Sequence, residues 1–263
     1  MNDFFKGKWA LVLGASSGFG EAACLRFAEA GLNIFGVHLD RKATQPNVDR
    51  IQSKIREFGC ASHFFNVNAA DDESRQKVVT EMRERAPGKV HILLHSLAFG
   101  ALKPFIADDP KERLSKAQVE MTIDVMASSL VYWAQDIAAA KLFTPNGRIY
   151  AMSSAGSSRV WKSYGAVSAA KAALESYCRQ LALELAPMGV TANAILAGVT
   201  ETPALRKIPG NQEMIEAASK RNPFGRLTMP DDVAQSLLAF SLPNCDFMTG
   251  NTIRIDGGEN IVD

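Results

Sequence analysis

The sequence predicts an α/β fold: one Rossmann-type, doubly wound parallel sheet with helices on both faces. Short apolar runs alternate with segments of helical spacing, a glycine-rich turn follows the first run, and no linker divides the chain. The 263 residues are 47% hydrophobic and 22% charged, which is ordinary for a globular domain. We therefore expect a single domain over residues 1–263.

The strands and helices follow one another in strict alternation. The apolar run at 8–14 ends in Gly14 and is typical of a strand buried on both faces. A helix at 19–30 ends before Gly31 and leads into a second strand at 33–38. Further strands are predicted at 62–67, 90–97, 147–153, 190–196 and 251–256, and further helices near 47–58, 71–85, 115–140, 164–187 and 230–241.

Residues 198–229 lack a clear period and are rich in Thr, Pro, Gly and Asn. They follow the carboxyl end of a strand, which is the edge of an open α/β sheet where ligands bind. We predict a substrate lid over 198–229, and an idle surface loop is the alternative.

Charge and cysteine content narrow the class of protein. Lys plus Arg (29) nearly balances Asp plus Glu (28), so no overall field attracts nucleic acid or an anionic membrane. No apolar run reaches the roughly 18 to 20 residues of a membrane span, and the first residues lack an export pattern. Cys24, Cys60, Cys178 and Cys245 have no metal-site spacing, so we expect buried, reduced thiols. A cytoplasmic protein with a small-molecule partner and no metal is expected.

The turn after the first strand carries the glycines of a dinucleotide site. Glycines at its first, fifth and seventh positions allow a tight turn, close approach of backbone to pyrophosphate, and tight helix packing. An ordinary glycine-rich turn is the alternative, but the strand-to-helix context favours cofactor binding. The residues predicted to contact the cofactor here are Gly14, Ser16, Ser17, Gly18, Phe19 and Gly20.

The spacing Gly-x3-Gly-x-Gly resembles the short-chain dehydrogenase/reductase family, and the resemblance covers essentially the whole chain. Asn66 and Val67 end the third strand, where this family contacts adenine. Asn193 begins the stretch that leads toward the nicotinamide, and Asp256-Gly257-Gly258 closes the last strand as the family's terminal motif does. The resemblance implies a nicotinamide cofactor.

The end of the second strand bears on the choice between NADPH and NADH. Leu39 occupies the position where NAD-preferring relatives carry an acid, while Arg41 and Lys42 offer cations for a 2′-phosphate. NADPH is therefore the predicted cofactor. A shift of one residue would bring Asp40 to the ribose and favour NADH instead.

The family's Tyr-x3-Lys motif is altered in this chain. Val167 occupies the usual tyrosine position, and Tyr164 stands seven residues before Lys171. In a continuous helix the two would share a face, roughly 10 Å apart along the axis. This Tyr-x6-Lys pattern resembles the enoyl-acyl-carrier-protein reductase branch, which implies that Tyr164 binds the thioester carbonyl and Lys171 the cofactor ribose.

Other segments agree with that branch. The run from His95 to Phe99 resembles its version of the loop after the fourth strand, and Ala197-Gly198 replaces the usual Pro-Gly. Met126 falls where most members have a relay asparagine, and a thioether cannot do that work. We expect His95 to be a packed, satisfied side chain. The cofactor contacts that the resemblance implies are Ser96, Leu97, Ala98, Ala197, Gly198, Val199 and Thr202.

Ser154 departs from the main enoyl reductase pattern, which has a second tyrosine at this place, and resembles a divergent subgroup of these reductases. A serine here is typical of carbonyl reductases, where it polarises the substrate carbonyl, so Ser154 is a third candidate catalytic residue. It could alternatively satisfy only the backbone at the strand end. Loss of the second tyrosine implies resistance to triclosan.

These observations predict an NADPH-dependent enoyl-[acyl-carrier-protein] reductase that reduces trans-2-enoyl thioesters in fatty acid synthesis. Lys171 is expected to lower the pKa of Tyr164. The family resemblance implies that the helices at 115–140 and 164–187 pair subunits into a homotetramer. A ketone, 3-oxoacyl or hydroxysteroid-type carbonyl reductase is the first alternative. A non-catalytic cofactor-binding module is the second, and Tyr164 with Lys171 argues against it.

Overall fold

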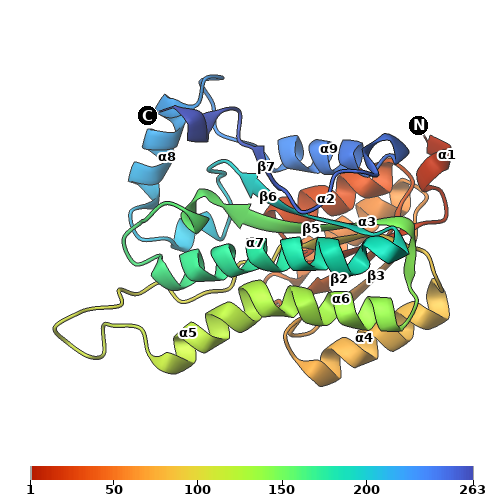
Figure 1. The fold of residues 1–263 in the computed structure, drawn as a ribbon, viewed down its shortest axis with the longest axis horizontal. Coiled ribbons are helices and arrows are strands. Elements are labelled where there is room, and N and C mark those ends of the chain that lie inside the picture. The colour runs from red at the N-terminus through yellow and green to blue at the C-terminus, as the bar shows by residue number, and fades with distance from the viewer. Residues whose placement is uncertain (1, 263) are drawn as a thin grey trace.

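The computed structural model describes residues 2–262. Its seven strands form one parallel sheet in the order β3-β2-β1-β4-β5-β6-β7, which confirms the predicted fold class (Figure 1). The order reverses between β1 and β4, and such a switch point opens a crevice at the carboxyl ends of the strands. The strands are β1 (Trp9–Leu13), β2 (Asn33–His38), β3 (Ser62–Asn66), β4 (Val90–His95), β5 (Phe143–Ser154), β6 (Thr191–Ala197) and β7 (Thr252–Ile255).

Helices cover both faces of the sheet (Figure 1). One face packs against α2 (Gly18–Glu29), α3 (Gln45–Glu57) and α9 (Pro230–Phe240). The other face packs against α4 (Asp72–Arg85), α6 (Ser129–Ala139) and α7 (Gly165–Leu185). Strand β1 contributes Ala10 and Val12 to one core and Leu11 and Leu13 to the other, so its continuous apolar run reflects burial on both sides.

The long helix predicted near 115–140 is present but interrupted. It consists of α5 (Lys116–Ile123), a π-helical turn at Asp124–Ser128, and then α6. A π-turn inserts one residue into the helix, shifts the following side chains around the axis, and occurs frequently at functional sites. Met126 lies in this turn, so the turn sets where the thioether points.

The segment predicted to be irregular contains a helix. Within 198–229 the chain forms a short 3-10 turn (Leu205–Lys207) and α8 (Asn211–Arg221). Only Ala218 of α8 is buried, so a mostly polar sequence hides the helical period. A short helix α1 (Asn2–Phe5) precedes β1.

The cysteines are all free, as expected. Three of them are buried, but Cys245 is only half-buried because it lies in a short 3-10 turn at the molecular surface, which corrects the expectation for that residue. Among residues 2–262, no helix has the length and apolar character needed to cross a membrane.

Candidate active site

The glycine turn after β1 is shaped by contacts that leave no room for side chains. Gly14 has a φ of +87°, and an added Cβ would overlap the carbonyl oxygen of Ser96 at the end of β4. A Cβ on Gly20 would overlap the carbonyl oxygen of Gly14, so the first turn of α2 packs directly on the loop. Gly18 (φ +56°) would bring a Cβ within 3.3 Å of Thr202 Cγ2. This backbone cradle fits a pyrophosphate group.

The N-terminus of α2 faces the same cradle. Ser17 is the N-cap residue and makes no side-chain capping bond, so the first N–H groups of α2 remain available to an anion. Asn47 of α3 donates from Nδ2 to the Ser16 carbonyl oxygen at 2.7 Å and to Glu21 at 3.1 Å, which fixes the loop. Asn47 was not predicted from the sequence, because no motif marks it.

The end of β2 holds one carboxylate and two exposed cations. The carboxylate of Asp40 lies 3.0 Å from His38 Nδ1 and is also hydrogen-bonded by Ser16 and Thr44, which lowers its pKa although burial opposes the shift. Leu39 is 69% exposed. Arg41 and Lys42 are exposed and form no ion pair within residues 2–262.

Asn66 positions the β2 end rather than presenting a free amide. Its Oδ1 accepts from the backbone N–H of Asp40 at 2.9 Å, and its Nδ2 donates to the Asp40 carbonyl at 3.0 Å. Val67 continues this link, because its N–H donates to the His38 carbonyl at 2.8 Å. The strand-end asparagine therefore orders the loop that carries Asp40 and Arg41.

A cavity of about 460 Å³ opens at the carboxyl ends of β4, β5 and β6. It brings together Tyr164, Lys171 and Ser154, the three predicted catalytic residues. It is also lined by Met214 and Ala217 of α8, so the predicted lid segment forms one wall. The predicted cofactor residues that line this cavity are Phe19, Ser96, Leu97, Ala98, Ala197, Gly198, Val199 and Thr202.

Tyr164 precedes the first residue of α7 and lies largely inside the cavity wall. An added Cβ on Gly156 would lie 2.7 Å from the Tyr164 ring, so the ring packs flush against this glycine. Burial raises the pKa of Tyr164, and a hydrogen bond with Ser154 partly offsets the shift. The expected lowering by Lys171 is therefore wrong for this structure, because burial dominates and the ammonium bonds elsewhere.

Lys171 is buried and held against β5. Its Nζ donates to the carbonyl oxygen of Met152 at 2.6 Å. Burial lowers the pKa of Lys171 to about 8, and the nearby Glu175 carboxylate acts in the opposite direction. Glu175 also accepts a 2.5 Å hydrogen bond from Ser153, which fixes the carboxylate beneath the site.

Ser154 makes the backbone contact considered for it and also lies in the cavity. Its Oγ accepts from the backbone N–H of Gly156 at 3.2 Å, which satisfies the strand end. The same hydroxyl is hydrogen-bonded to Tyr164 inside the cavity. Ser154 is thus available both to position Tyr164 and to meet a substrate carbonyl.

Val167 and Met126, which occupy the positions of the family's usual tyrosine and relay asparagine, both pack against Gly100. An added Cβ on Gly100 would lie 2.7 Å from Val167 Cγ2 and 2.8 Å from Met126 Sδ. Both side chains are buried and line the cavity. Neither can donate a proton, so Tyr164 is the hydroxyl-bearing side chain that α7 supplies to this end of the cavity.

His95 is buried but only half satisfied, which corrects the expectation of a fully bonded side chain. Its Nε2 lies 2.9 Å from Ser129 Oγ, whose proton is donated to the Val125 carbonyl, so Nε2 carries the histidine proton. Nδ1 has no partner within residues 2–262. Burial, with the Lys171 charge, lowers the pKa of His95 to about 3, so the ring is neutral.

The loop after β6 is tied to the C-terminal segment. Glu259, buried in a 3-10 turn at Glu259–Ile261, accepts from the Val199 N–H at 2.9 Å. A Cβ on Gly198 would lie 2.9 Å from the same carboxylate, so the backbone must approach closely here. Thr202 Oγ1 accepts from the Leu205 N–H at 3.2 Å and so begins the 3-10 turn. Sequence reasoning missed Glu259.

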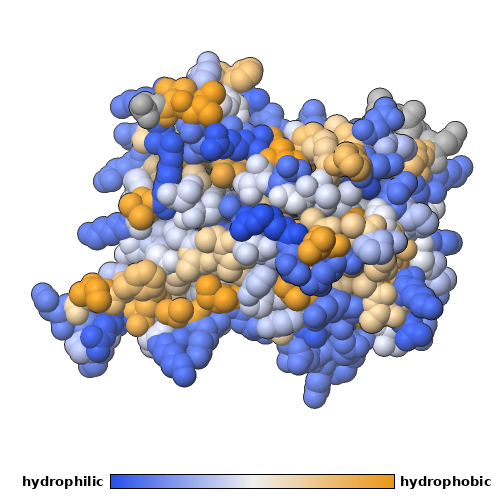
Figure 2. Space-filling model, viewed as in Figure 1, coloured by the Kyte–Doolittle hydropathy of each residue, from blue (hydrophilic) through white to orange (hydrophobic). Residues whose placement is uncertain are grey.

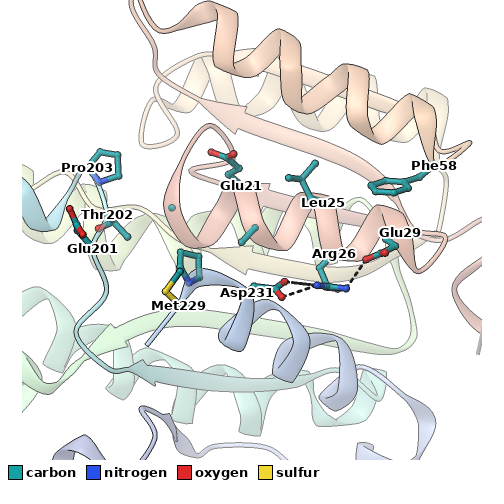
Figure 3. A pocket seen from close by; sticks show the side chains of 13 residues that line it. Glu21, Leu25, Arg26, Glu29, Phe58, Glu201, Thr202, Pro203, Met229 and Asp231 are labelled. Carbon is teal, nitrogen blue, oxygen red and sulfur yellow. Dashed lines mark hydrogen bonds and ion pairs between the residues drawn. The ribbon is translucent and has the colours of Figure 1, made fainter. Parts of the chain in front are cut away.

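A second hollow, of about 490 Å³, lies on the outer side of α2 beside α9 (Figure 3). Arg26 points across it and is bonded to Asp231 at 2.8 Å and to Glu29 at 2.7 Å. Thr202 lines both this hollow and the main cavity. Because the Arg26 guanidinium is already paired with two carboxylates, this hollow is a weaker candidate for a ligand site than the cavity at the strand ends.

Comparisons with known proteins agree with this geometry. A family model described as Enoyl-(Acyl carrier protein) reductase matches residues 14–260. The chain is 28% identical over 259 residues to (2S)-[(R)-hydroxy(phenyl)methyl]succinyl-CoA dehydrogenase subunit BbsD of Thauera aromatica, covering 96% of each chain. It is also 28% identical over 260 residues to the NADH enoyl-[acyl-carrier-protein] reductase of Nostoc sp., covering 97% of each.

A solved structure shows the same fold throughout. The NADH enoyl-[acyl-carrier-protein] reductase of Aquifex aeolicus superposes with a TM-score of 0.85 at 25% identity, covering 98% of each chain. The matches carry mixed enzyme names, so they establish an oxidoreductase with a nicotinamide-binding Rossmann fold. The chain belongs to the short-chain dehydrogenase/reductase family, within the group that the enoyl-(acyl carrier protein) reductase model describes.

Proposed function

We propose that the protein is an enoyl-thioester reductase that uses NADPH. The observation that carries this proposal is the pairing of Tyr164 and Lys171 in one cavity, with apolar Val167 and Met126 at the two positions of the usual proton relay. A site without that proton relay suits a reaction in which the substrate oxygen is stabilised as an anion and the new proton is added to carbon. Reduction of a carbon–carbon double bond conjugated to a thioester is such a reaction.

The reduced nicotinamide, when bound, supplies the hydride that the β-carbon of a trans-2-enoyl thioester accepts. Tyr164 donates a hydrogen bond to the thioester oxygen, which becomes an enolate oxygen as the hydride arrives, and stabilisation of this kind is worth roughly 3–4 kcal/mol. Lys171, fixed by Met152, holds the ribose hydroxyls. The raised pKa of Tyr164 keeps its proton in place for this donation near neutral pH. Protonation of the α-carbon completes the reduction.

The direct test of this role is Tyr164→Phe. We expect kcat for crotonyl thioester reduction to fall by roughly 10²–10³-fold, while the KM for NADPH stays near that of the unmodified enzyme. Tyr177→Phe is the matched control, because Tyr177 lies on α7, the helix that Tyr164 immediately precedes, but outside the cavity lining. Full activity of Tyr164→Phe would remove the proposed role.

The proposed preference for NADPH rests on the donors around Asp40. His38 bonds the Asp40 carboxylate at 3.0 Å, and Ser16 and Thr44 also stabilise the charged form, so the carboxylate is less available to a ribose hydroxyl. Arg41 is exposed beside it and has no carboxylate partner in the described chain, so its guanidinium is available to a 2′-phosphate.

A carbonyl reductase is the second candidate, and the Ser154–Tyr164 hydrogen bond favours it. In that reaction both hydroxyls would bond the substrate carbonyl, and Tyr164 would give its proton to oxygen. The Thauera aromatica relative is named for dehydrogenation of a hydroxyacyl-CoA, the reverse of a ketone reduction. Ser154→Ala separates the two, because it should abolish ketone reduction and only moderately slow enoyl reduction.

We further propose that the chain forms a homotetramer and takes its acyl groups from acyl carrier protein in cytoplasmic fatty acid synthesis. Figure 2 shows apolar side chains along the lower left of this face, over the loop that leads into α5. Exposed apolar residues of this loop and of α7 support self-association: Phe105, Ile106 and Leu183. A monomer in analytical ultracentrifugation would contradict the tetramer. Activity with coenzyme A thioesters but not with acyl-carrier-protein thioesters would contradict acyl carrier protein as the proposed carrier.

A further inference from the structure

We propose that one end of the cavity is an anion subsite, in which Arg159 and Arg221 bind a carboxylate or phosphate group belonging to the substrate. This inference rests on the proposed function only in taking the substrate to be an acyl thioester. Both arginines line the same cavity as Tyr164 and Lys171. They lie at the end where α8 meets the C-terminal 3-10 turn.

Arg221 is the first support, because its guanidinium makes no hydrogen bond within residues 2–262. It forms a long ion pair from Nη2 to Glu259 Oε1 at 3.7 Å, beyond hydrogen-bond distance. Its Nε is buried without a partner among residues 2–262. A half-buried guanidinium with free N–H groups is costly unless an anion completes it.

The other arginines of similar burial make the contrast clear. Four arginines in the described chain are buried or half-buried: Arg26, Arg75, Arg148 and Arg221. The first three donate hydrogen bonds to the carboxylates of Asp231, Asp136 and Asp246 respectively. Arg221 therefore departs from the pattern of this protein, and it does so at the cavity wall.

Arg159 is the second support. Its only hydrogen bond in the described chain runs from Nη2 to the Asn260 carbonyl at 3.3 Å, which leaves most of its donors free. Asn260 follows Glu259, so Arg159 and Arg221 both contact the C-terminal turn at Glu259–Ile261. Burial raises the pKa of Glu259, and the charges of both arginines offset part of this rise.

The charges on the cavity wall favour an anionic ligand. Four cations line the cavity, namely Arg159, Lys171, Lys207 and Arg221, against the single carboxylate of Glu259. One Glu259 oxygen is occupied by the Val199 N–H. The chain as a whole carries a formal charge of only +1, so this excess is local. Lys171 is fixed on Met152, which leaves the two arginines and Lys207 for a substrate anion.

The ligand chemistry has two possible sources, and three saturated thioesters distinguish them. Butyryl-N-acetylcysteamine carries no charge, glutaryl-N-acetylcysteamine carries a carboxylate on the acyl chain, and butyryl-coenzyme A carries phosphates on the carrier. Binding of each is measured by calorimetry in the presence of NADP⁺, for the intact enzyme and for the double variant Arg159→Gln/Arg221→Gln. Lys220→Gln is the control, because Lys220 is exposed on α8 and lies outside the cavity lining.

We expect the double variant to weaken binding of at least one anionic thioester by roughly tenfold or more, with a much smaller change for the neutral one. A loss confined to glutaryl-N-acetylcysteamine identifies an acyl carboxylate, and a loss confined to butyryl-coenzyme A identifies a carrier phosphate. Arg221→Lys, which retains the charge, should recover part of the affinity. Equal losses for all three ligands, or no loss, would overturn the subsite. Because binding needs no turnover, this result is independent of whether enoyl reduction is observed.

Discussion

Lys171 donates from Nζ to the carbonyl oxygen of Met152 at 2.6 Å, so the β5 backbone holds the ammonium below the cavity floor. Tyr164, seven residues earlier, lies outside the first turn of α7 and packs on Gly156 instead. The two polar groups are therefore fixed by different parts of the β5–α7 connection. With this separation, Lys171 is placed to position the cofactor and Tyr164 is placed to contact the substrate.

The first prediction concerns pH. Because burial lowers the pKa of Lys171 to about 8, Nζ loses its proton and its positive charge as the pH rises through that value. We expect the KM for the cofactor to rise above about pH 8 and to remain constant below it. Lys171→Arg should flatten this profile, because a guanidinium stays protonated. The KM is obtained from initial rates at each pH. A KM of the unmodified enzyme that does not change between about pH 7 and pH 10 would contradict the role of Lys171 in cofactor binding.

The second prediction concerns the glycine cradle. Gly20→Ala places a Cβ against the Gly14 carbonyl, so we expect a loss of about 1–3 kcal/mol in the free energy of unfolding together with weaker cofactor binding. Gly59→Ala is the control: Gly59 has φ +77° but open space around it, so the cost of roughly 1–2 kcal/mol should be backbone strain alone. Denaturant unfolding and cofactor titration check both. Unchanged cofactor affinity in Gly20→Ala would argue against the cradle.

The third prediction concerns cofactor choice. Arg41→Ala should raise the KM for NADPH by roughly tenfold through loss of a charge-assisted hydrogen bond, and it should leave the KM for NADH unchanged. Asp40→Ala should lower the KM for NADPH, because it removes a negative charge beside the 2′-phosphate. Arg56→Ala, an exposed change on α3, serves as the control. If instead Asp40→Ala weakens NADH binding and Arg41→Ala has no effect on NADPH, the enzyme prefers NADH.

The fourth prediction concerns inhibition by triclosan. Ser154 supplies a small hydroxyl beside Tyr164, at the place where the enoyl reductase pattern that the sequence resembles has a second tyrosine. We expect weak inhibition of the unmodified enzyme and tighter inhibition of Ser154→Tyr, because the added ring restores an apolar contact. Inhibition curves with crotonyl thioester measure both. Nanomolar inhibition of the unmodified enzyme would contradict this role of Ser154.

The sheet could be predicted from the sequence because its central strands, such as β1, β4 and β6, are buried on both faces and give apolar runs. Helix α8 could not, since only Ala218 of that helix is buried and its period is hidden by polar residues. The π-turn at Asp124–Ser128 also leaves no signal, because one inserted residue hardly alters hydrophobic spacing.

The residues of the candidate site also fall into two groups, those that could be identified from the sequence and those that could not. Tyr164, Lys171 and Ser154 could be identified because their spacing along the chain is a motif. Asn47, Arg159 and Glu259 could not, because each acts through a contact with a segment far away in the sequence. The raised pKa of Tyr164 could not be predicted either, because the burial that causes it is known only once the ring is placed in the fold.

The most direct test of the central claim is NADPH oxidation, followed by absorbance, with crotonyl thioester and acetoacetyl thioester compared under identical conditions. Enoyl reduction through Tyr164 predicts turnover of the crotonyl substrate and little or none of the acetoacetyl substrate. Turnover of the acetoacetyl substrate alone would contradict the account and would make Ser154 and Tyr164 the carbonyl-binding pair of a ketone reductase.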